Sequence, residues 1–270
     1  MHTSLAGIVC LFSAWSLAGC VKAPPERVGE IPELTVHAAV SLSRVVEDLA
    51  DAFAAQHACR FNFNFASSGA LARQLIAAPR GELFLSANPE WMQRVVDAGA
   101  VREATAEVLF ANQLVVVGNL ASQFAPVGIE PGREFCGLAF EYLSIGDPAY
   151  VPVGQYAHAW LRTINCGTSD AWTRFQDRIL PANDAHAALA RVRSSAGIIG
   201  IVYQTDYQAQ ADAYRLLYAV PQESGPPIQY LGAILKAAHH PDLSAAFLDF
   251  IQSSEGRTIL SHHGFGPLER

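Results

Sequence analysis

Hydrophobic positions along the chain follow two spacings, that of a buried strand and that of an amphipathic helix. Residues 34–39 form a short β-favouring run that ends in small residues, and apolar side chains then recur at helical spacing from Leu42 to Phe53. The same order of strand, tight turn and helix repeats twice, with strands predicted at 60–65 and 82–86. Strands that alternate with helices predict an α/β parallel sheet, in which ligands bind beyond the carboxyl ends of the strands.

A second set of α/β segments follows a continuous apolar strand predicted at 114–117. The later predicted segments are strands at 138–145, 197–203 and 230–235, and helices over 152–161, 184–192 and 243–251. Two similar lobes in one chain predict a cleft between them. We expect the first lobe to comprise 33–113 and 219–270, and the second to comprise 114–218.

The first twenty residues have the pattern of an export signal. Residues 5–18 form a nearly unbroken apolar stretch, which is too short to cross a bilayer comfortably but has the length of a signal-peptide core. The stretch Leu17-Ala18-Gly19-Cys20 resembles the bacterial lipobox, whose cysteine is lipidated and becomes the mature N-terminus. We therefore expect a lipoprotein signal peptide over 1–19, lipidation at Cys20 and a solvated tether over 20–32. The alternative is a plain secretory signal in which this cysteine is incidental.

Composition excludes several classes of protein. The chain is 51% apolar and 16% charged, so it can bury a large core and is not intrinsically disordered. Its formal net charge of −7 is spread along the chain, whereas nucleic-acid binding requires clustered cations. Apart from the N-terminal stretch, the sequence has no apolar run of about 20 residues that could span a membrane.

Three cysteines are expected to remain in the mature chain. Cys10 would leave with the signal peptide and Cys20 would carry lipid, which leaves Cys59, Cys136 and Cys166. In an oxidising compartment one pair can be bridged and one thiol left over, and the sequence leaves the pairing open. The absence of any C-x-x-C spacing gives little support to a structural zinc site.

Two serines, Ser41 and Ser68, stand at predicted strand-to-helix junctions. A hydroxyl donor beside the unpaired backbone N–H groups of a helix N-terminus is suited to binding an anion. Pro152-Val153-Gly154 and Asp184-Ala185 supply two more such junctions, so several helix N-termini could surround a dianion without a full cation. Each serine taken alone is better explained as an ordinary N-cap, worth about 1 kcal/mol to its helix. The hypothesis of an anion site therefore depends on the four junctions together.

The order of these motifs resembles that of the molybdate-binding proteins of ABC importers. The resemblance is carried by residues 35–42, 65–74, 83–87, 91–92, 112–117, 146–148, 152–157 and 200–203 and by Asp206. It extends from about Leu34 to Gly266. It implies a two-lobed periplasmic binding protein fold of type II, in which each lobe is a mainly parallel sheet flanked by helices and the ligand lies in the interlobe cleft.

The same resemblance implies which residues hold a tetrahedral oxyanion. Ser41 and Ser68 would donate hydroxyl and backbone hydrogen bonds from the first lobe. Val153 and Ala185 would offer backbone N–H groups from the second, and Tyr203 would donate its phenol. Taken alone, Tyr203 is better explained as a core aromatic residue at a strand end. No side chain is expected to ligate a metal directly, and no cofactor is expected.

A site made only of hydrogen-bond donors discriminates between anions by their protonation. An anion that still carries a proton would leave a buried donor unpaired, at a cost of about 1–3 kcal/mol. This argument disfavours phosphate and admits molybdate, tungstate and sulfate. The last discrimination among these three is cavity size.

The function implied by the resemblance is the capture of molybdate or tungstate and its delivery to an ABC permease, with no bond made or broken. We expect a lipid-anchored monomer in the periplasm or on the outer face of the cytoplasmic membrane. The nearer alternative is a binding protein of the same fold for another oxyanion such as sulfate. The remote alternative is an extracytoplasmic serine hydrolase using Ser41 or Ser68, which the absence of G-x-S-x-G and H-E-x-x-H motifs disfavours.

Two residues depart from the family's pattern. Arg44 falls in the first turn of the helix that Ser41 opens, where a cation opposes the helix dipole, so it either points to solvent or adds charge to the site. Glu82 stands where the family usually has Asp. The pairs His239-His240 and His262-His263 suggest metal binding, but adjacent side chains point apart, which favours solvated loop histidines.

Overall fold

The computed structural model describes residues 31–123, 135–221 and 224–266. The expected signal peptide, the lipidation site Cys20 and the tether as far as Glu30 lie outside the described residues. Residues 31–270 belong to one compact unit. In the part of the chain that is described, no helix has the length and apolar character needed to cross a membrane.

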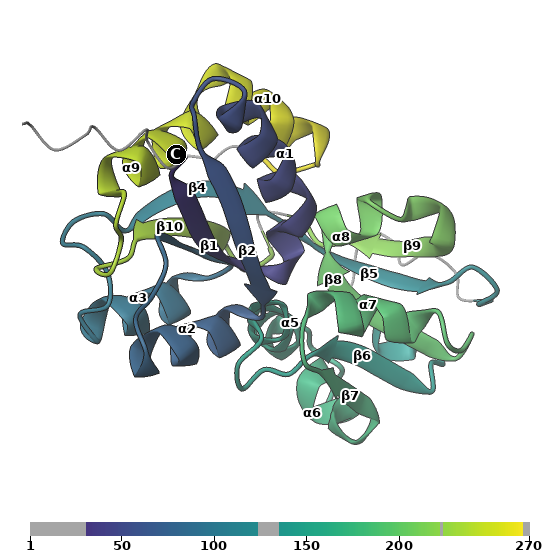
Figure 1. The fold of residues 1–270 in the computed structure, drawn as a ribbon. Helices are drawn as coiled ribbons and strands as arrows, with labels where there is room; N and C mark the ends of the chain where they lie inside the picture. The colour runs from purple at the N-terminus through teal and green to yellow at the C-terminus, as the bar shows by residue number, and fades with distance from the viewer. Residues whose placement is uncertain (1–30, 124–134, 222–223, 267–270) are drawn as a thin grey trace, which may run out of the picture. The chain divides into compact units, whose positions relative to one another are not determined.

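The first of two sheets has five strands in the order β2-β1-β3-β10-β4 (Figure 1). The strands are Glu33–Ala39 (β1), Arg60–Ala66 (β2), Leu83–Ser86 (β3), Glu107–Asn112 (β4) and Ile228–Ile234 (β10). Strands β2 and β3 run parallel to β1, whereas β10 runs antiparallel to its neighbours β3 and β4. The sheet is therefore parallel apart from β10.

The second sheet repeats this plan in the order β7-β6-β8-β5-β9. Its strands are Leu114–Asn119 (β5), Tyr142–Gly146 (β6), Ile179–Ala182 (β7), Ile198–Tyr203 (β8) and Tyr214–Ala219 (β9). Strand β5 runs antiparallel to β8 and β9, and the other pairs are parallel. The chain passes between the sheets at Gln113, and it returns between Ala219 and Ile228. We call the first sheet with its helices the first lobe and the second sheet with its helices the second lobe.

Helices cover the sheets. They are Ser43–Ala54 (α1), Ser68–Ala77 (α2), Pro89–Asp97 (α3), Pro152–Thr163 (α5), Ala171–Phe175 (α6), Ala185–Val192 (α7), Gln204–Gln208 (α8), Pro241–Gln252 (α9) and Ser254–His262 (α10). Helices α1, α9 and α10 pack together on one side of the first sheet, and α2 and α3 pack on the other (Figure 1). Successive strand residues therefore face different cores: Leu83 and Leu85 belong to the buried cluster that includes residues of α1 and α9, whereas Phe84 belongs to the cluster of α2 and α3. The predicted fold of two mainly parallel sheets flanked by helices is confirmed.

Two elements begin at least two residues later than predicted. The first helix begins at Ser43 rather than at Ser41, because a 3-10 turn over Val40–Leu42 comes before it. The strand predicted at 138–145 begins only at Tyr142, which pairs with Ile198, the first residue of β8. In the described part of the chain, residues 138–141 pair with no strand, so the apolar pattern alone overestimates the length of this strand.

A disulfide joins Cys136 to Cys166, and Cys59 is a buried free thiol. The bridge connects the segment before β6 to the segment after α5. The pairing left open by the sequence is therefore resolved in favour of the two cysteines of the second lobe.

Loss of this disulfide should destabilise the protein. The bonded cysteines are 30 residues apart, and closing a loop of that length stabilises the folded chain by about 3–4 kcal/mol in the chain-entropy model. We expect the double variant Cys136→Ala, Cys166→Ala to lose about that much unfolding free energy in urea denaturation. Reductant should destabilise the unaltered protein to the same extent and leave the double variant unaffected. A double variant as stable as the oxidised protein would contradict the prediction.

Candidate functional site

The five residues that the sequence predicts at the site line a single cavity between the lobes. Its walls are Ala39, Val40, Ser41, Ser67, Ser68 and Ala87 from the first lobe and Val151, Pro152, Val153, Ala185 and Tyr203 from the second. None of these residues is charged. The walls lie so close together that the cavity has a volume of only about 10 Å³.

Two adjacent serines at the start of α2 have different roles. Ser67 is the N-cap residue, and its hydroxyl accepts a hydrogen bond from the Ala70 N–H at 3.4 Å. Ser68 is fully buried, and its hydroxyl accepts from the Ala87 N–H at 2.9 Å. Because a hydroxyl that accepts a hydrogen bond still has its own hydrogen to donate, Ser68 can donate to an anion in the cavity. The N-cap role that could explain Ser68 belongs to Ser67.

Ser41 is oriented by residues that the sequence analysis did not select. Its hydroxyl oxygen lies 3.2 Å from that of Tyr230, which accepts a hydrogen bond from the Asn112 side chain, also at 3.2 Å. Either hydroxyl of this pair can be the donor. When Tyr230 donates, the Ser41 hydrogen is free for the cavity. Asn112 also donates to the Thr205 hydroxyl at 2.9 Å and so connects β4 to α8 of the other lobe.

The second lobe presents the N-termini of two helices. Val153 follows Pro152 in the first turn of α5, and Ala185 is the first residue of α7. Among the described residues, neither N–H has a hydrogen-bond acceptor, as is usual for the first turn of a helix. Asp184 caps α7 by accepting from the Ala187 N–H at 2.8 Å, as its position predicts. Both cavity-lining N–H groups thus remain available to a ligand.

A glycine allows α5 to begin this close to the sheet. A Cβ atom at Gly154 would collide with the carbonyl group of Gly146, the last residue of β6. With glycine at this position, the first turn of α5 lies directly against the strand end. The Val153 N–H is held beside the cavity by this contact.

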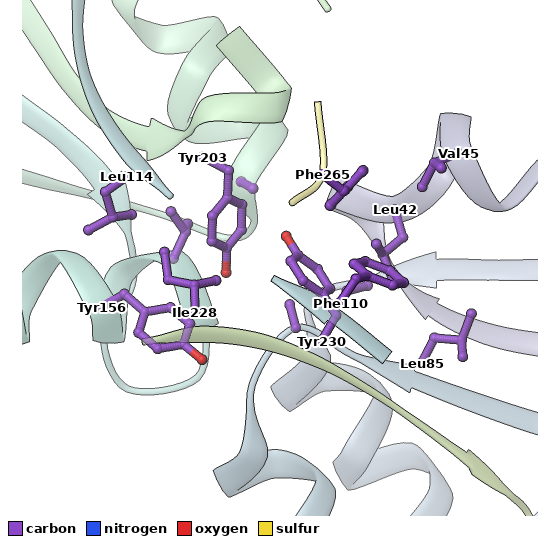
Figure 2. Packing of buried hydrophobic residues seen from close by; sticks show 14 of the residues in the cluster. Leu42, Val45, Leu85, Phe110, Leu114, Tyr156, Tyr203, Ile228, Tyr230 and Phe265 are labelled. Carbon is purple, nitrogen blue, oxygen red and sulfur yellow. The ribbon is translucent and has the colours of Figure 1, made fainter. Parts of the chain in front are cut away.

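Tyr203 supplies an unpartnered hydroxyl. It is the last residue of β8 and is 1% exposed, and its hydroxyl has no hydrogen-bond partner in the part of the chain that is described. Its ring centroid lies 5.9 Å from that of Tyr230 of the first lobe (Figure 2). Burial raises the pKa of the Tyr203 phenol well above its ordinary value, so this group stays protonated and can donate. An unsatisfied buried hydroxyl costs about 1–3 kcal/mol, which an anion oxygen would recover.

Asp206, part of the motif that carries the resemblance, does not line this cavity. Its side chain is buried, and one carboxylate oxygen lies 3.4 Å from the His186 ring. Burial raises the pKa of Asp206, and the hydrogen bond with Asp206 raises the pKa of His186. The two side chains form a coupled pair beside the cavity.

The departures from the family pattern also lie away from the cavity. Both carboxylate oxygens of Glu82 accept backbone hydrogen bonds, from His239 at 3.0 Å and from His240 at 2.9 Å, so this residue stabilises a turn. Arg44 is exposed and does not belong to the cavity wall. Within the described ranges, no group of three or more His, Cys, Asp or Glu side chains is placed to hold a metal ion.

The fold is that of a two-lobed periplasmic binding protein, with a small uncharged cavity where hydrogen-bond donors of both lobes meet. The chain belongs to the bacterial extracellular solute-binding protein family, which it matches over residues 34–266. Its relatives are solute-binding proteins, in line with the expectation that the chain is not an enzyme.

Two curated relatives extend over most of the chain. The chain is 32% identical over 234 residues to the molybdate-binding protein ModA of Haemophilus influenzae. This alignment covers 86% of the chain and 89% of ModA. The chain is 26% identical to the putative ABC transporter substrate-binding lipoprotein YvgL of Bacillus subtilis, with 86% and 85% covered. The periplasmic molybdate-binding protein of Azotobacter vinelandii has the same fold, with a TM-score of 0.74 at 20% identity over 87% of this chain and 100% of that one. The predicted family is confirmed.

Removal of the Tyr203 hydroxyl should not destabilise the fold of the ligand-free protein. We expect Tyr203→Phe to keep or increase the unfolding free energy in urea, because the lost hydroxyl has no hydrogen-bond partner in the described structure. Tyr230→Phe is the matched control and should lose about 1–2 kcal/mol, since it removes a hydroxyl that bonds Ser41 and Asn112. Equal losses in the two variants would contradict this account of Tyr203.

Proposed function

We propose that this protein binds molybdate or tungstate in the cavity between its lobes and delivers the anion to an ABC permease. The observation that carries the proposal is the buried hydroxyl of Tyr203, which has no partner among the residues described, in a cavity also lined by Ser68 and by the N–H groups of Val153 and Ala185. The identity to a ModA protein over most of the chain supports molybdate as the anion.

The chemistry of the cavity favours a fully deprotonated anion. The groups that line it can donate hydrogen bonds, namely three serine hydroxyls, a tyrosine hydroxyl and the N–H groups of Val153 and Ala185. A ligand proton would face another donor and leave a buried group unpaired. Hydrogenphosphate is therefore disfavoured, whereas a tetrahedral dianion without protons satisfies every donor.

Helix N-termini supply the positive potential that binding requires. Helices α2, α5 and α7 each begin at a cavity residue or one residue before it. The first turn of a helix carries partial positive charge and free N–H groups, which stabilise an anion without a full cation. A tetrahedral oxyanion is larger than the space between the walls, so the lobes must separate to admit it.

The cellular setting follows from the N-terminal pattern and the family. We place the mature protein in the periplasm or on the outer face of the cytoplasmic membrane, as a monomer anchored by lipid at Cys20. The description of the Bacillus subtilis relative as a lipoprotein supports the anchor. Capture and transfer of the anion leave its bonds intact.

Calorimetric titration with four anions tests the choice of ligand. We expect tight one-to-one binding of molybdate and tungstate, much weaker binding of sulfate and none of phosphate at neutral pH. Sulfate binding as tight as that of molybdate would identify the nearer alternative as correct. Absence of heat with all four anions would overturn the proposal.

Ser68 should contribute directly to affinity. We expect Ser68→Ala to weaken molybdate binding by about 1–3 kcal/mol, or about 5- to 150-fold in Kd, because it removes a buried donor to a charged ligand. Ser244→Ala is the matched control, since Ser244 is equally buried but donates to the His240 carbonyl outside the cavity. Unchanged affinity in Ser68→Ala would remove this residue from the site.

A further inference from the structure

A groove beside the cavity is lined by basic side chains of both lobes. Its volume is about 530 Å³, compared with about 10 Å³ for the cavity. Arg44 of α1 borders it from the first lobe, and Arg193, directly after α7, borders it from the second. The histidines at its walls are His186, His262 and His263.

Two arginines and one buried acid line this groove, together with three histidines. Its buried acid, Asp206, is paired with His186, and His263 is bonded to the Asp48 carboxylate at 2.7 Å. Among the described residues, neither Arg44 nor Arg193 forms a salt bridge with an acid. The groove therefore has a local excess of positive charge in a chain whose formal net charge is −7.

The groove and the cavity meet at Ser41, which lines both. An anion that enters the groove therefore lies next to one of the donors of the cavity. A cleft lined by one sign of charge raises the local concentration of the opposite ion and can increase association rates 10- to 1000-fold. Without it, a dianion would approach a protein of the same overall sign.

We propose that this groove is an encounter site, where Arg44 and Arg193 hold the dianionic oxyanion before it passes Ser41 into the cavity. The inference rests on the proposed function. It gives the two arginines a role in the association of the anion with the protein and none in the final complex, in which the anion lies in the cavity. In the structure described here, Arg44 donates to the Ala209 carbonyl of the second lobe at 3.2 Å. Once the lobes are closed, that carbonyl binds the guanidinium, and the cavity remains free of cations.

Stopped-flow measurement of molybdate association with the purified protein, followed by tryptophan fluorescence, tests this assignment. We expect the double variant Arg44→Gln, Arg193→Gln to associate about 5- to 20-fold more slowly at low ionic strength, with a weaker dependence on salt. Arg193→Gln alone should slow association and leave the dissociation rate unchanged, because Arg193 does not line the cavity.

The matched control removes the same charge elsewhere. Arg60 and Arg257 are exposed and lie outside the groove, so Arg60→Gln, Arg257→Gln should associate like the unaltered protein. Equal association rates in the two double variants, with molybdate binding intact in the unaltered protein, would overturn the encounter site alone. Failure of the unaltered protein to bind any of the four oxyanions would overturn the proposed function and this assignment together.

Discussion

The backbone N–H groups in the first turn of a helix have no hydrogen-bond partner inside that helix. How these groups find partners determines both the helix caps and the donors that face the cavity. Side chains satisfy some of them, as Ser67 does for α2 and Asp184 does for α7. The N–H groups of Val153 and Ala185 beside the cavity have no acceptor within residues 31–123, 135–221 and 224–266. The second lobe thus directs groups toward the cavity that only an acceptor can satisfy, and since no charged side chain lines the cavity, the acceptor has to come from the ligand.

The sequence predicts every strand inside the two sheets but only one of the four edge strands, β2. Strands β1, β3 and β8 lie inside their sheets and have long buried runs. Strands β4, β7 and β9 had no prediction, and each is at the edge of its sheet, where exposed positions interrupt the apolar pattern. An edge strand is specified by the neighbour it pairs with, so its own composition carries a weaker signal.

The residues of the candidate site that belong to short sequence motifs could be predicted. Those that reach the site through contacts between distant parts of the chain could not. Strand-to-helix junctions and the resemblance selected Ser41, Ser68 and Tyr203, which the structure brings together. They did not select Tyr230 or Asn112, because the contact between Tyr230 and Ser41 joins residues 189 positions apart. The pairing of Cys136 with Cys166 was likewise left open, since it depends on the position of α5 relative to β6.

The position of β10 determines when each lobe can be completed. It lies inside the first sheet between β3 and β4, although it follows the whole second lobe in the chain. The second sheet takes all its strands from residues 114–219, so it can be complete while the first still lacks a central strand. During synthesis from the N-terminus, the lobe that begins first is therefore finished last. Until Ile228–Ile234 arrives, the unpaired edges of β3 and β4 are exposed to any strand that could add to them.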